Sequence, residues 1–391
     1  MIGIPTITGA KVWHRRKHGA RAAAVLLAAT ALAACGSAGS SSGTTTTSGG
    51  ASNTAVSSGV AAATAALQPY MSEPTKINIT TPLKSKPPTN KTVVFLGTSD
   101  PSNVLVQQMV QKLCGILHWN YSLVTYDPAN PGTFTAAIST ALQKHPDFLT
   151  ESGMPLTSAQ ISMVQSSGAK WVLNSVYPST ITGPILGITD TGVQDSLMGK
   201  IVADYFVSDS KGQGHAIIEH VPAYPILDAF VSGFQNEVKA TCPKCTTMVE
   251  NVTIPQLVAG QVPSVMVAAV RSNPSANYLV FDDGPFADGV PAALAGAGLA
   301  GKVKIIGEAA DTTAIAALKA GTEAAWTGFD PSYQGYLTVD MMLRSVEGMS
   351  IPVADEAVQP TQLLTHSNVG SITQWSAPSD ALAQFEALWK L

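Results

Sequence analysis

The chain has 391 residues, of which 45 % are hydrophobic and 12 % are charged, so it holds enough apolar material for a packed core and is not a disordered chain. Its 22 Lys and Arg residues and 26 Asp and Glu residues give a formal net charge of −4, which excludes a basic surface for nucleic acid. Four cysteines in a chain of this length exclude a disulfide-dense scaffold.

The first 34 residues have the features of an export signal. Five basic residues and no acidic ones lie in 1–21, and an apolar run of eleven residues, 22–32, follows them. That run is too short to span a bilayer and matches the core of a signal peptide. It leads into Leu-Ala-Ala-Cys at 32–35, which resembles the lipobox of bacterial lipoproteins. We therefore expect 1–34 to be a lipoprotein signal peptide, with acylation of the Cys35 thiol after cleavage.

Cleavage before Cys35 would remove the five positive charges and take the formal charge from −4 to −9. An acidic exported protein has little reason to lie on an anionic membrane, so acyl chains would carry the membrane attachment. An ordinary signal peptide followed by a chance cysteine is the alternative.

Residues 35–90 are expected to be the lipidated cysteine and a flexible linker. The stretch 36–67 is almost entirely Ser, Thr, Gly and Ala, a composition that cannot bury a core. The stretch 68–90 adds several prolines and alternating polar residues, which predicts a semi-extended lead-in to a folded unit.

The pattern changes at Lys91, where short apolar, β-branched runs begin to alternate with longer segments of helical periodicity. The short runs predict strands at Thr92–Leu96, Tyr121–Tyr126, Asp147–Thr150, Lys170–Leu173, Ile185–Thr189, His215–Glu219, Thr246–Val249, Tyr278–Phe281, Val303–Gly307 and Ala324–Thr327. The longer segments predict helices at Val104–Leu117, Thr133–Lys144, Ser158–Gln165, Val193–Ser208, Ile226–Ala240, Val258–Arg271, Asp288–Ala297, Thr312–Ala320 and Gln334–Glu347. This alternation predicts an α/β fold with parallel sheets covered by helices on both faces. Residues 91–391 suffice for two such lobes.

Polar residues collect where the predicted strands end. In open parallel sheets, ligands bind beyond the carboxyl ends of the strands. The strand ends carry Gly97, Thr98, Ser99, Asp100, Glu151, Ser152, Asn174, Ser175, His220, Asp282, Asp283 and Glu308, and the aromatic residues that accompany them are Tyr177, Tyr224, Phe281, Phe286 and Tyr333. Hydrogen-bonding groups beside flat apolar faces are typical of a site for a small polar ligand.

The order of these segments resembles the type I periplasmic binding protein family, in particular its ribose-binding and related sugar-binding lipoproteins. The resemblance covers roughly 91–364 and rests on several motifs in order, not on one decisive motif. The motifs are Asp-Pro-Ser at 100–102, Gly-Lys-Ile-Val-Ala-Asp-Tyr at 199–205, Ser-Gly-Phe at 232–234, Phe-Asp-Asp-Gly at 281–284, the strand at 302–307, Leu-Lys-Ala-Gly at 318–321 and the segment 331–335.

The resemblance implies two Rossmann-like lobes with parallel sheets, joined by a three-strand hinge whose crossings lie near Thr191, 330–333 and Leu363. A ligand in the cleft closes the lobes because it contacts both of them only in the closed form, which then docks on a membrane permease. The expected lobe boundaries are 91–190 and 334–362 for the N-terminal lobe and 191–333 and 363–391 for the C-terminal lobe.

The resemblance also implies ligand-binding residues in the first lobe. Asp100 takes the position of a family residue that holds ligand hydroxyls. Ser102 and Asn103 take the positions where ribose binders place two stacking phenylalanines. Glu151 or Ser152 falls at the position of an asparagine.

Further positions show where the chain departs from the family. Asp283 falls at an Asn or Asp position and Tyr333 at a Gln position. Ser175 begins a Ser-Val pair in place of an Asp-Arg pair, Phe230 stands where an arginine of the second lobe is expected, and Ala309 replaces an aspartate. The charged groups that hold ring hydroxyls are therefore mostly missing. A pocket with acids and aromatics but no evident arginine suits a neutral polyol or a cationic amine better than a carboxylate or phosphate.

Cys242 and Cys245 form a C-x-x-C pair after a predicted helix. A redox pair would need the N-terminus of a helix, where the thiol pKa is lowered, and a zinc site would need a second pair. In an exported protein the spacing favours a local disulfide that pins the turn.

No metal and no cofactor are expected. The seven histidines have no ligand spacing. The glycines of 296–301 satisfy G-x-G-x-x-G, but they end a predicted helix and lead into a strand, whereas a dinucleotide-binding loop must follow a strand and open a helix.

We expect an extracytoplasmic, lipid-anchored, monomeric solute-binding protein, not an enzyme, that captures a small polar ligand and delivers it to an ABC import permease. A sugar or polyol is the expected ligand. The alternative is a sensor lipoprotein that presents an amine, nucleoside or aromatic ligand to a membrane receptor. An exported hydrolase ranks lower because no nucleophile, base and orienting acid stand together at the strand ends. A transcriptional regulator, and with it a nucleic-acid partner, is excluded because an export signal occupies the place of the DNA-binding helices.

Overall fold

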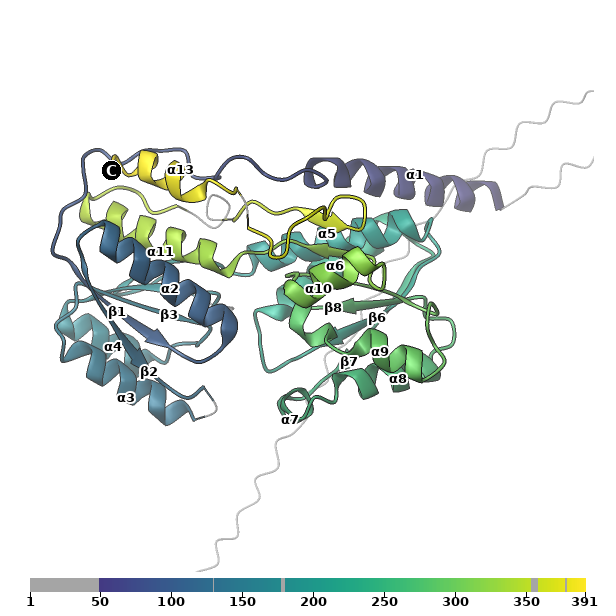
Figure 1. Cartoon of the computed structure of the whole chain (residues 1–391), viewed down its shortest axis with the longest axis horizontal. Coiled ribbons are helices and arrows are strands. Elements are labelled where there is room, and N and C mark those ends of the chain that lie inside the picture. The colour runs from purple at the N-terminus through teal and green to yellow at the C-terminus, as the bar shows by residue number, and fades with distance from the viewer. Residues whose placement is uncertain (1–48, 129, 177–179, 353–357, 377) are drawn as a thin grey trace, which may run out of the picture. The chain divides into compact units, whose positions relative to one another are not determined.

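The computed structural model describes residues 49–128, 130–176, 180–352, 358–376 and 378–391. Two α/β units form around two sheets, a 5-stranded sheet of order β2-β1-β3-β4-β5 and a 6-stranded sheet of order β11-β10-β9-β8-β6-β7 (Figure 1). We call these units the first lobe and the second lobe. The predicted α/β fold with two mostly parallel sheets is confirmed.

The first lobe is a fully parallel sheet between two helical layers. Along its central strand, Val93 and Phe95 face the core under α2 and α11, whereas Val94 and Leu96 face the core under α3 and α4. This alternation explains why the strand is apolar throughout: both faces are covered. The elements are β1 (Thr92–Gly97), α2 (Pro101–Ile116), β2 (Asn120–Thr125), α3 (Pro131–Leu142), β3 (Phe148–Ser152), α4 (Ser158–Ser167), β4 (Lys170–Asn174), β5 (Ile185–Ile188) and α11 (Pro331–Val346).

The second lobe repeats this plan, with α5 and α6 on one face of its sheet and α8, α9 and α10 on the other. Its strands are parallel except β11, which pairs with β10 in the antiparallel sense. The elements are α5 (Val193–Asp209), β6 (His215–His220), α6 (Leu227–Thr241), β7 (Thr246–Asn251), α7 (Ile254–Val258), α8 (Val262–Ser272), β8 (Tyr278–Phe281), the 3₁₀ turn η2 (Gly284–Ala287), α9 (Val290–Gly296), β9 (Lys304–Gly307), α10 (Thr312–Ala320), β10 (Ala325–Thr327) and β11 (Leu363–Thr365).

Helices α5 and α6 approach each other closely because each carries a glycine at the contact. A Cβ atom on Gly199 would lie 2.3 Å from the carbonyl oxygen of Phe230, and one on Gly233 would lie 2.3 Å from that of Ser196. Both distances are far shorter than real carbon contacts, so any larger side chain would push the helices apart.

The chain passes between the two sheets at three places, as the resemblance implies. It leaves the first sheet after β5 through 189–192, returns from β10 to α11 through 328–330, and enters the second sheet again at β11. The backbone N–H of Gln359 donates to the side chain of Gln194 at 2.9 Å, which joins the third passage to the start of α5. The passages therefore lie against the carboxyl edge of the first sheet and the start of the second lobe.

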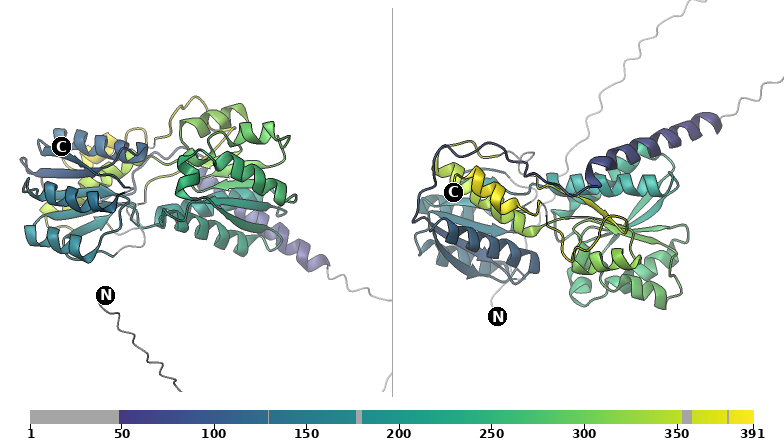
Figure 2. Two further views of the ribbon diagram at one scale, coloured as in Figure 1. Left: turned by 90° about the horizontal axis from the view of Figure 1, so that it is seen from below. Right: turned by 45° about the horizontal axis from the view of Figure 1, so that its top comes forward.

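The expected flexible linker is wrong for residues 49–90. Residues Gly49–Leu67 form helix α1, followed by the 3₁₀ turn η1 (Gln68–Tyr70), and α1 lies along α5 (Figures 1 and 2). Ala63 and Leu67 of α1 are buried and belong to the same hydrophobic cluster as side chains of α5 and α6. Farther along, Ile77 and Leu83 are buried in the first-lobe core. The low-complexity composition did not indicate helix α1, because small residues such as Ala63 suffice for a helix that packs on the flat surface of another helix.

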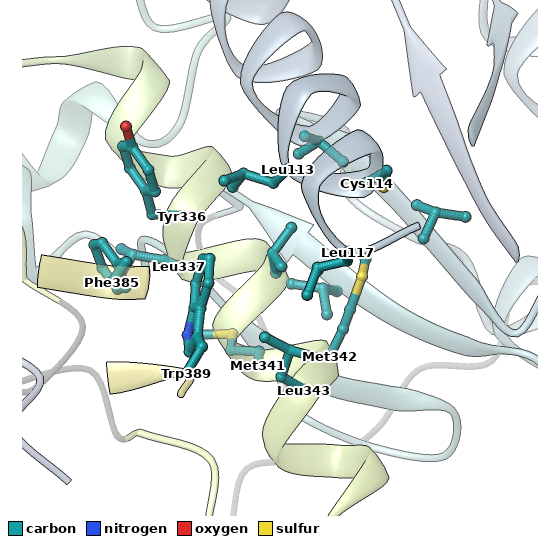
Figure 3. Close-up of a cluster of buried hydrophobic side chains, with 14 of the residues drawn as sticks. Leu113, Cys114, Leu117, Tyr336, Leu337, Met341, Met342, Leu343, Phe385 and Trp389 are labelled. Carbon is teal, nitrogen blue, oxygen red and sulfur yellow. The ribbon is translucent and has the colours of Figure 1, made fainter. Parts of the chain in front are cut away.

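The expected placement of the whole tail, 363–391, in the second lobe is wrong for its last helix. That helix, α13 (Ala381–Leu388), packs with Trp389 against α11 in the first lobe (Figure 3). The Phe385 ring stacks on Tyr336 with centroids 4.9 Å apart. The Trp389 indole N–H donates to Asp340 at 2.9 Å. Only β11 and the turn after it belong to the second lobe.

Candidate functional site

The first candidate residues follow β1, in the loop that opens α2. The Asp100 carboxylate caps α2 by accepting the backbone N–H of Asn103 at 3.0 Å, and the remainder of Asp100 is exposed. The Asn103 side chain turns back and accepts the N–H of Thr98 at 3.0 Å, which braces the loop. Asn103 is buried, whereas Ser102 is exposed on the first turn of the helix. Asp100 and Ser102 are therefore presented to solvent on a loop that Asn103 holds.

Glu151 lies at the end of β3 with its side chain fully buried. One carboxylate oxygen accepts the N–H of Met154 at 3.2 Å, and the other has no hydrogen-bond partner. Burial raises the pKa of Glu151 to about 8, and the bond from Met154 opposes this shift only in part. The side chain of the neighbouring Ser152 lies outside the described atoms.

A polar network fixes the ends of β4 and β5 against α11. The Asn174 side chain donates to the Thr150 hydroxyl at 2.9 Å and accepts the hydroxyl of Thr338 at 2.7 Å. The Gln334 amide donates to the Ser175 hydroxyl at 2.7 Å. Ser175 has a left-handed backbone with φ of 50°, so the strand ends abruptly and the hydroxyl is turned toward α11.

At the matching edge of the second sheet, His220 lies between two carboxylates. Its Nδ1 lies 2.7 Å from Asp282 and its Nε2 lies 3.0 Å from Asp228. Burial alone would lower the pKa of His220, but the hydrogen bonds and charges of Asp282 and Asp228 outweigh it and raise the pKa. The register pairs Ile218 with Val280, so His220 and Asp282 stand at the same level of the sheet.

Asp283 and Glu308 follow β8 and β9 on the same edge. Asp283 is half-buried, and Glu308 is 1 % exposed. Burial, together with the charges of Asp282 and Asp100, raises the pKa of Asp283 well above its usual range. Burial and the charges of neighbouring acids, Asp195 first, do the same for Glu308. This edge therefore favours protonated acids or a compensating cation.

Three residues at the edges of the two sheets lie within range of one another's charges. The Asp283 carboxyl of the second lobe feels the charge of Asp100 from the first lobe, and the Tyr224 hydroxyl, from the loop after β6, feels both. Tyr224 is 44 % exposed, so part of its ring is accessible for contact. The structure thus places Asp100 and Asp283 within range of each other's charge, and their contact with a ligand stays a prediction.

Two expected ligand residues, Phe230 and Tyr333, lie in the hydrophobic cores instead. Phe230 is fully buried in the second lobe and its ring packs against Phe234, with centroids 6.4 Å apart. Tyr333 is 1 % exposed in the first lobe, in contact with Phe385 and Tyr336. Both predictions are wrong because side chains on the inner face of a helix point to the core and not to the strand ends.

The structure joins Cys242 and Cys245 in a disulfide at the end of α6, and Cys114 is a buried free thiol. The disulfide lies before β7, at the amino edge of the sheet and away from the site. Cys35, the expected lipidation residue, lies outside the described residues.

Within the described ranges, no group of three or more His, Cys, Asp or Glu side chains is arranged to hold a metal ion. No helix in the described part of the chain combines the length and the apolar character that a bilayer crossing requires.

The set of expected ligand residues omitted three acids that the structure places beside Asp283: Asp190, Asp195 and Glu219. Asp190 ends the passage from β5, Asp195 lies in the first turn of α5, and Glu219 lies within β6. Of these three acids, Glu219 could have been recognised from the sequence, because a charged residue inside an otherwise apolar buried strand is rare unless it has a partner or a function.

Known proteins support this architecture. The family model described as "Periplasmic binding protein domain" matches residues 92–350, which is more than half of the chain. No curated protein sequence matches the chain.

Several solved structures share the fold at low sequence identity. A periplasmic ribose ABC transporter protein from Conexibacter woesei has a TM-score of 0.62 at 16 % identity, over 75 % of this chain and 98 % of that one. A solute-binding protein from Actinobacillus succinogenes with bound D-allose has a TM-score of 0.62 at 14 % identity, over 72 % and 100 %. The 5-methylthioribose transporter solute-binding protein of Thermotoga lettingae has a TM-score of 0.61 at 17 % identity, over 80 % and 99 %.

Proposed function

Because the chain belongs to the periplasmic binding protein family, we propose that it is an extracytoplasmic, lipid-anchored solute-binding protein that captures a sugar or polyol between its lobes and delivers it to an ABC import permease. The matched family and the similar structures are solute-binding proteins, so the chain is a binding protein and not an enzyme.

The observation that carries the proposal is that Asp100, Tyr224 and Asp283 lie within range of one another's charges. Two carboxyl groups from different lobes act on one exposed tyrosine, so a small ligand placed there would touch both lobes at once. Such a ligand has more contacts when the lobes are closed, and this difference in affinity would shift the population to the closed form.

The chemistry of these groups suits ligand hydroxyls. A carboxylate accepts hydrogen bonds, and a protonated carboxyl group both donates and accepts, as a hydroxyl does. The raised pKa of Asp283 favours its protonated form, while the exposed Tyr224 ring offers a flat face for the C–H side of a sugar ring.

We expect one or more members of a panel of pentoses, hexoses, alditols and amino sugars to raise the melting temperature of the purified protein. A ligand at about 100 times its dissociation constant adds about 2.7 kcal/mol of stability. The variants Asp100→Asn and Tyr224→Ala should weaken binding at least tenfold, because each removes a contact from a different lobe. Asp209→Asn, at the far end of α5, is the matched control and should bind like the wild type. A panel without any shift, or variants without any loss, would contradict the proposal.

The lipid anchor is a separate part of the proposal, and it rests on the Leu-Ala-Ala-Cys pattern at 32–35. An acyl chain contributes about 0.8 kcal/mol per buried methylene, so two or three chains hold a protein on a membrane. In bacterial cells expressing the chain, we expect the wild type in the membrane fraction and Cys35→Ser in the soluble fraction. Equal distribution of the two would exclude Cys35 as the anchor.

A further inference from the structure

Six carboxyl groups gather at the carboxyl edge of the second sheet, and we call them the inner acidic cluster. They come from the β5–α5 passage, the first turn of α5, the end of β6 and the loops after β8 and β9. Its members are Asp190, Asp195, Glu219, Asp282, Asp283 and Glu308.

The members of the inner acidic cluster act on one another directly. The charge of Asp190 raises the pKa of Asp195. The Glu308 carboxyl feels the charges of Asp195, Asp282, Asp283 and Asp190. The cluster is thus one electrostatic unit built from four separate chain segments.

Several buried oxygens of the cluster lack any hydrogen-bond partner. They are one oxygen each of Asp195, Asp282 and Glu308 and both oxygens of Glu219, on residues that are 7 %, 1 %, 1 % and 0 % exposed in that order. Buried polar atoms in native proteins are almost always paired, and an unpaired one costs about 1–3 kcal/mol. Five such atoms in one cluster indicate acceptors that await donors from outside the chain.

The chain supplies almost no positive charge to this cluster. Among the described residues, the group in contact with it that becomes a cation when protonated is His220, which Asp282 shares with Asp228. In the described part of the chain, the ion pairs of Lys91, Lys200, Lys304 and Arg344 go to acids outside the cluster.

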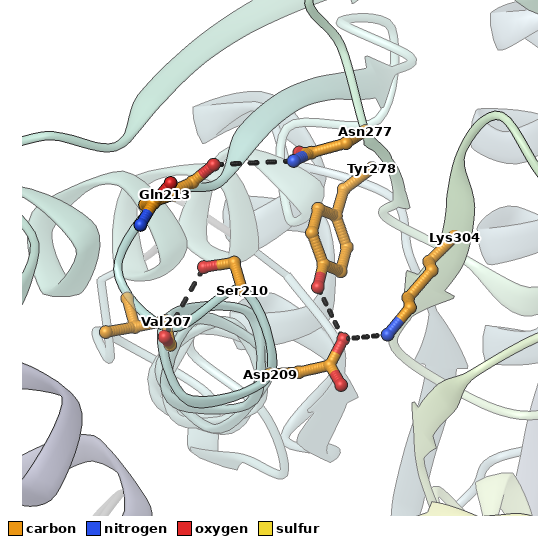
Figure 4. A network of polar contacts seen from close by, with 7 residues as sticks. All are labelled: Val207, Asp209, Ser210, Gln213, Asn277, Tyr278 and Lys304. Carbon is orange, nitrogen blue, oxygen red and sulfur yellow. Dashed lines mark hydrogen bonds and ion pairs between the residues drawn. The ribbon is translucent and has the colours of Figure 1, made fainter.

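Several lysines of the second lobe lie at the opposite, amino edge of the sheet. Lys304 begins β9 and donates to Asp209 at 2.6 Å, and Asp209 also accepts the hydroxyl of Tyr278 (Figure 4). Lys211 and Lys244 line a pocket of about 540 Å³ on that same side, before β6 and β7. The fold therefore places these three lysines at the amino ends of the strands, whereas the inner acidic cluster lies at the carboxyl ends.

We propose that the ligand is a hydroxylated amine, such as an amino sugar or amino alditol, whose ammonium group is held by the inner acidic cluster while its hydroxyl groups face Asp100 and the first lobe. An ammonium supplies one positive charge and three N–H donors, which are the two things that the cluster lacks. This inference rests on the proposed function, since it names the ligand class of the same site.

Burial and mutual repulsion support this assignment. Burial and the charge of Asp190 raise the pKa of Asp195 well above its usual range, so without a cation the cluster holds extra protons. A bound ammonium would replace those protons with a permanent charge and permanent donors. A neutral sugar would leave the repulsion between the acids in place, and an anionic sugar would add to it.

The experiment compares matched pairs of ligands on the purified protein by isothermal titration calorimetry. The pairs are D-glucosamine and D-glucose, D-galactosamine and D-galactose, and D-glucamine and D-sorbitol, with N-acetyl-D-glucosamine as the uncharged amide. We expect the amine of at least one pair to bind at least tenfold more tightly than its neutral partner, and N-acetylation to abolish the gain.

Variants assign the gain to the cluster. Glu308→Gln and Asp283→Asn should each lower the affinity for the amine at least tenfold. Each should also reduce the difference in affinity between the amine and its neutral partner. The two variants lie in different loops, so a folding failure of one leaves the other to decide. Asp209→Asn, at the amino edge of the sheet, should keep the wild-type difference in affinity between the amine and its neutral partner.

The outcomes separate this inference from the proposed function. Neutral members that bind as tightly as amines would overturn the inference and leave sugar binding intact. An amine preference that survives both cluster variants would also overturn it, because the charge would then be recognised elsewhere. A panel in which nothing binds would contradict both the inference and the proposed function.

Discussion

Replacing Phe385 with alanine is expected to lower the free energy of unfolding by about 3–5 kcal/mol, the range for a fully buried phenylalanine. The ring is 0 % exposed and contacts the rings of Tyr333, Tyr336 and Trp389, so the surrounding aromatic residues cannot close over the cavity without moving together. Urea unfolding of the purified protein, followed by tryptophan fluorescence, measures the change.

The matched control for this variant is Leu391→Ala in the same tail. Leu391 is 43 % exposed, so its truncation should change the stability by no more than about 0.5 kcal/mol. If Phe385→Ala were as mild as Leu391→Ala, the tail would not be part of the first-lobe core, and α13 would be an appendage.

Helix α13 matters because it ties three distant segments together. The backbone N–H of Leu83 donates to Leu388 at 2.9 Å, and the Gln384 amide donates to the carbonyl of Thr75 at 2.9 Å. Arg344 of α11 donates to the carbonyl of Thr81 at 2.7 Å and pairs with the buried Asp340. The N-terminal segment therefore runs from α1 on the second lobe to α13 on the first, held by both.

The regular part of the fold was predictable from the sequence. Each of the ten predicted strands lies in the structure, because short β-branched runs bounded by polar turns have few alternatives at that length. The start of α2 at Asp100 follows from the same local chemistry, because an aspartate before a proline satisfies free N–H groups at the start of a helix. Local chemistry decides such features.

Features that depend on distant contacts were not predictable in the same way. Helix α1 has a composition typical of a linker, and its order comes from Ala63 and Leu67 packing on α5. Phe230 could have been assigned to the core, since Phe234 follows it at helical spacing on the same face of α6. The approach of Glu308 to Asp190 and Asp195 joins two segments that are far apart in the chain, through the order of the elements in the fold, which no local pattern encodes.

The buried carboxyl group of Glu151 predicts a pH-dependent stability of known sign. Its pKa is about 8 in the folded chain, raised by burial from the ordinary value of 4.5. Between pH 4.5 and pH 8 the folded state therefore binds more protons at this group than the unfolded state does, so stability falls as the pH rises through that window. The loss is complete once the pH exceeds the folded pKa.

A glutamine at this position removes the titrating group and keeps the acceptor for the Met154 N–H. One unit of pKa difference corresponds to about 1.4 kcal/mol, so Glu151→Gln should raise the free energy of unfolding by about 2–4 kcal/mol at pH 7.5 relative to the wild type. The gain should disappear near pH 4.5, where both side chains are neutral when buried. Urea unfolding of both proteins at pH 4.5, 6 and 7.5 measures it.

Glu347→Gln provides a control of opposite sign. Glu347 accepts the Ser85 hydroxyl at 2.7 Å and the N–H of Lys84 at 2.7 Å, and these hydrogen bonds lower its pKa. Its contribution to stability is present above the unfolded pKa and is lost as the pH falls, so this variant should be less stable than the wild type at neutral pH and approach it in acid. A stability gain in Glu151→Gln that stayed constant across the pH series would mean that better packing, and not the removal of a buried acid, stabilises the variant.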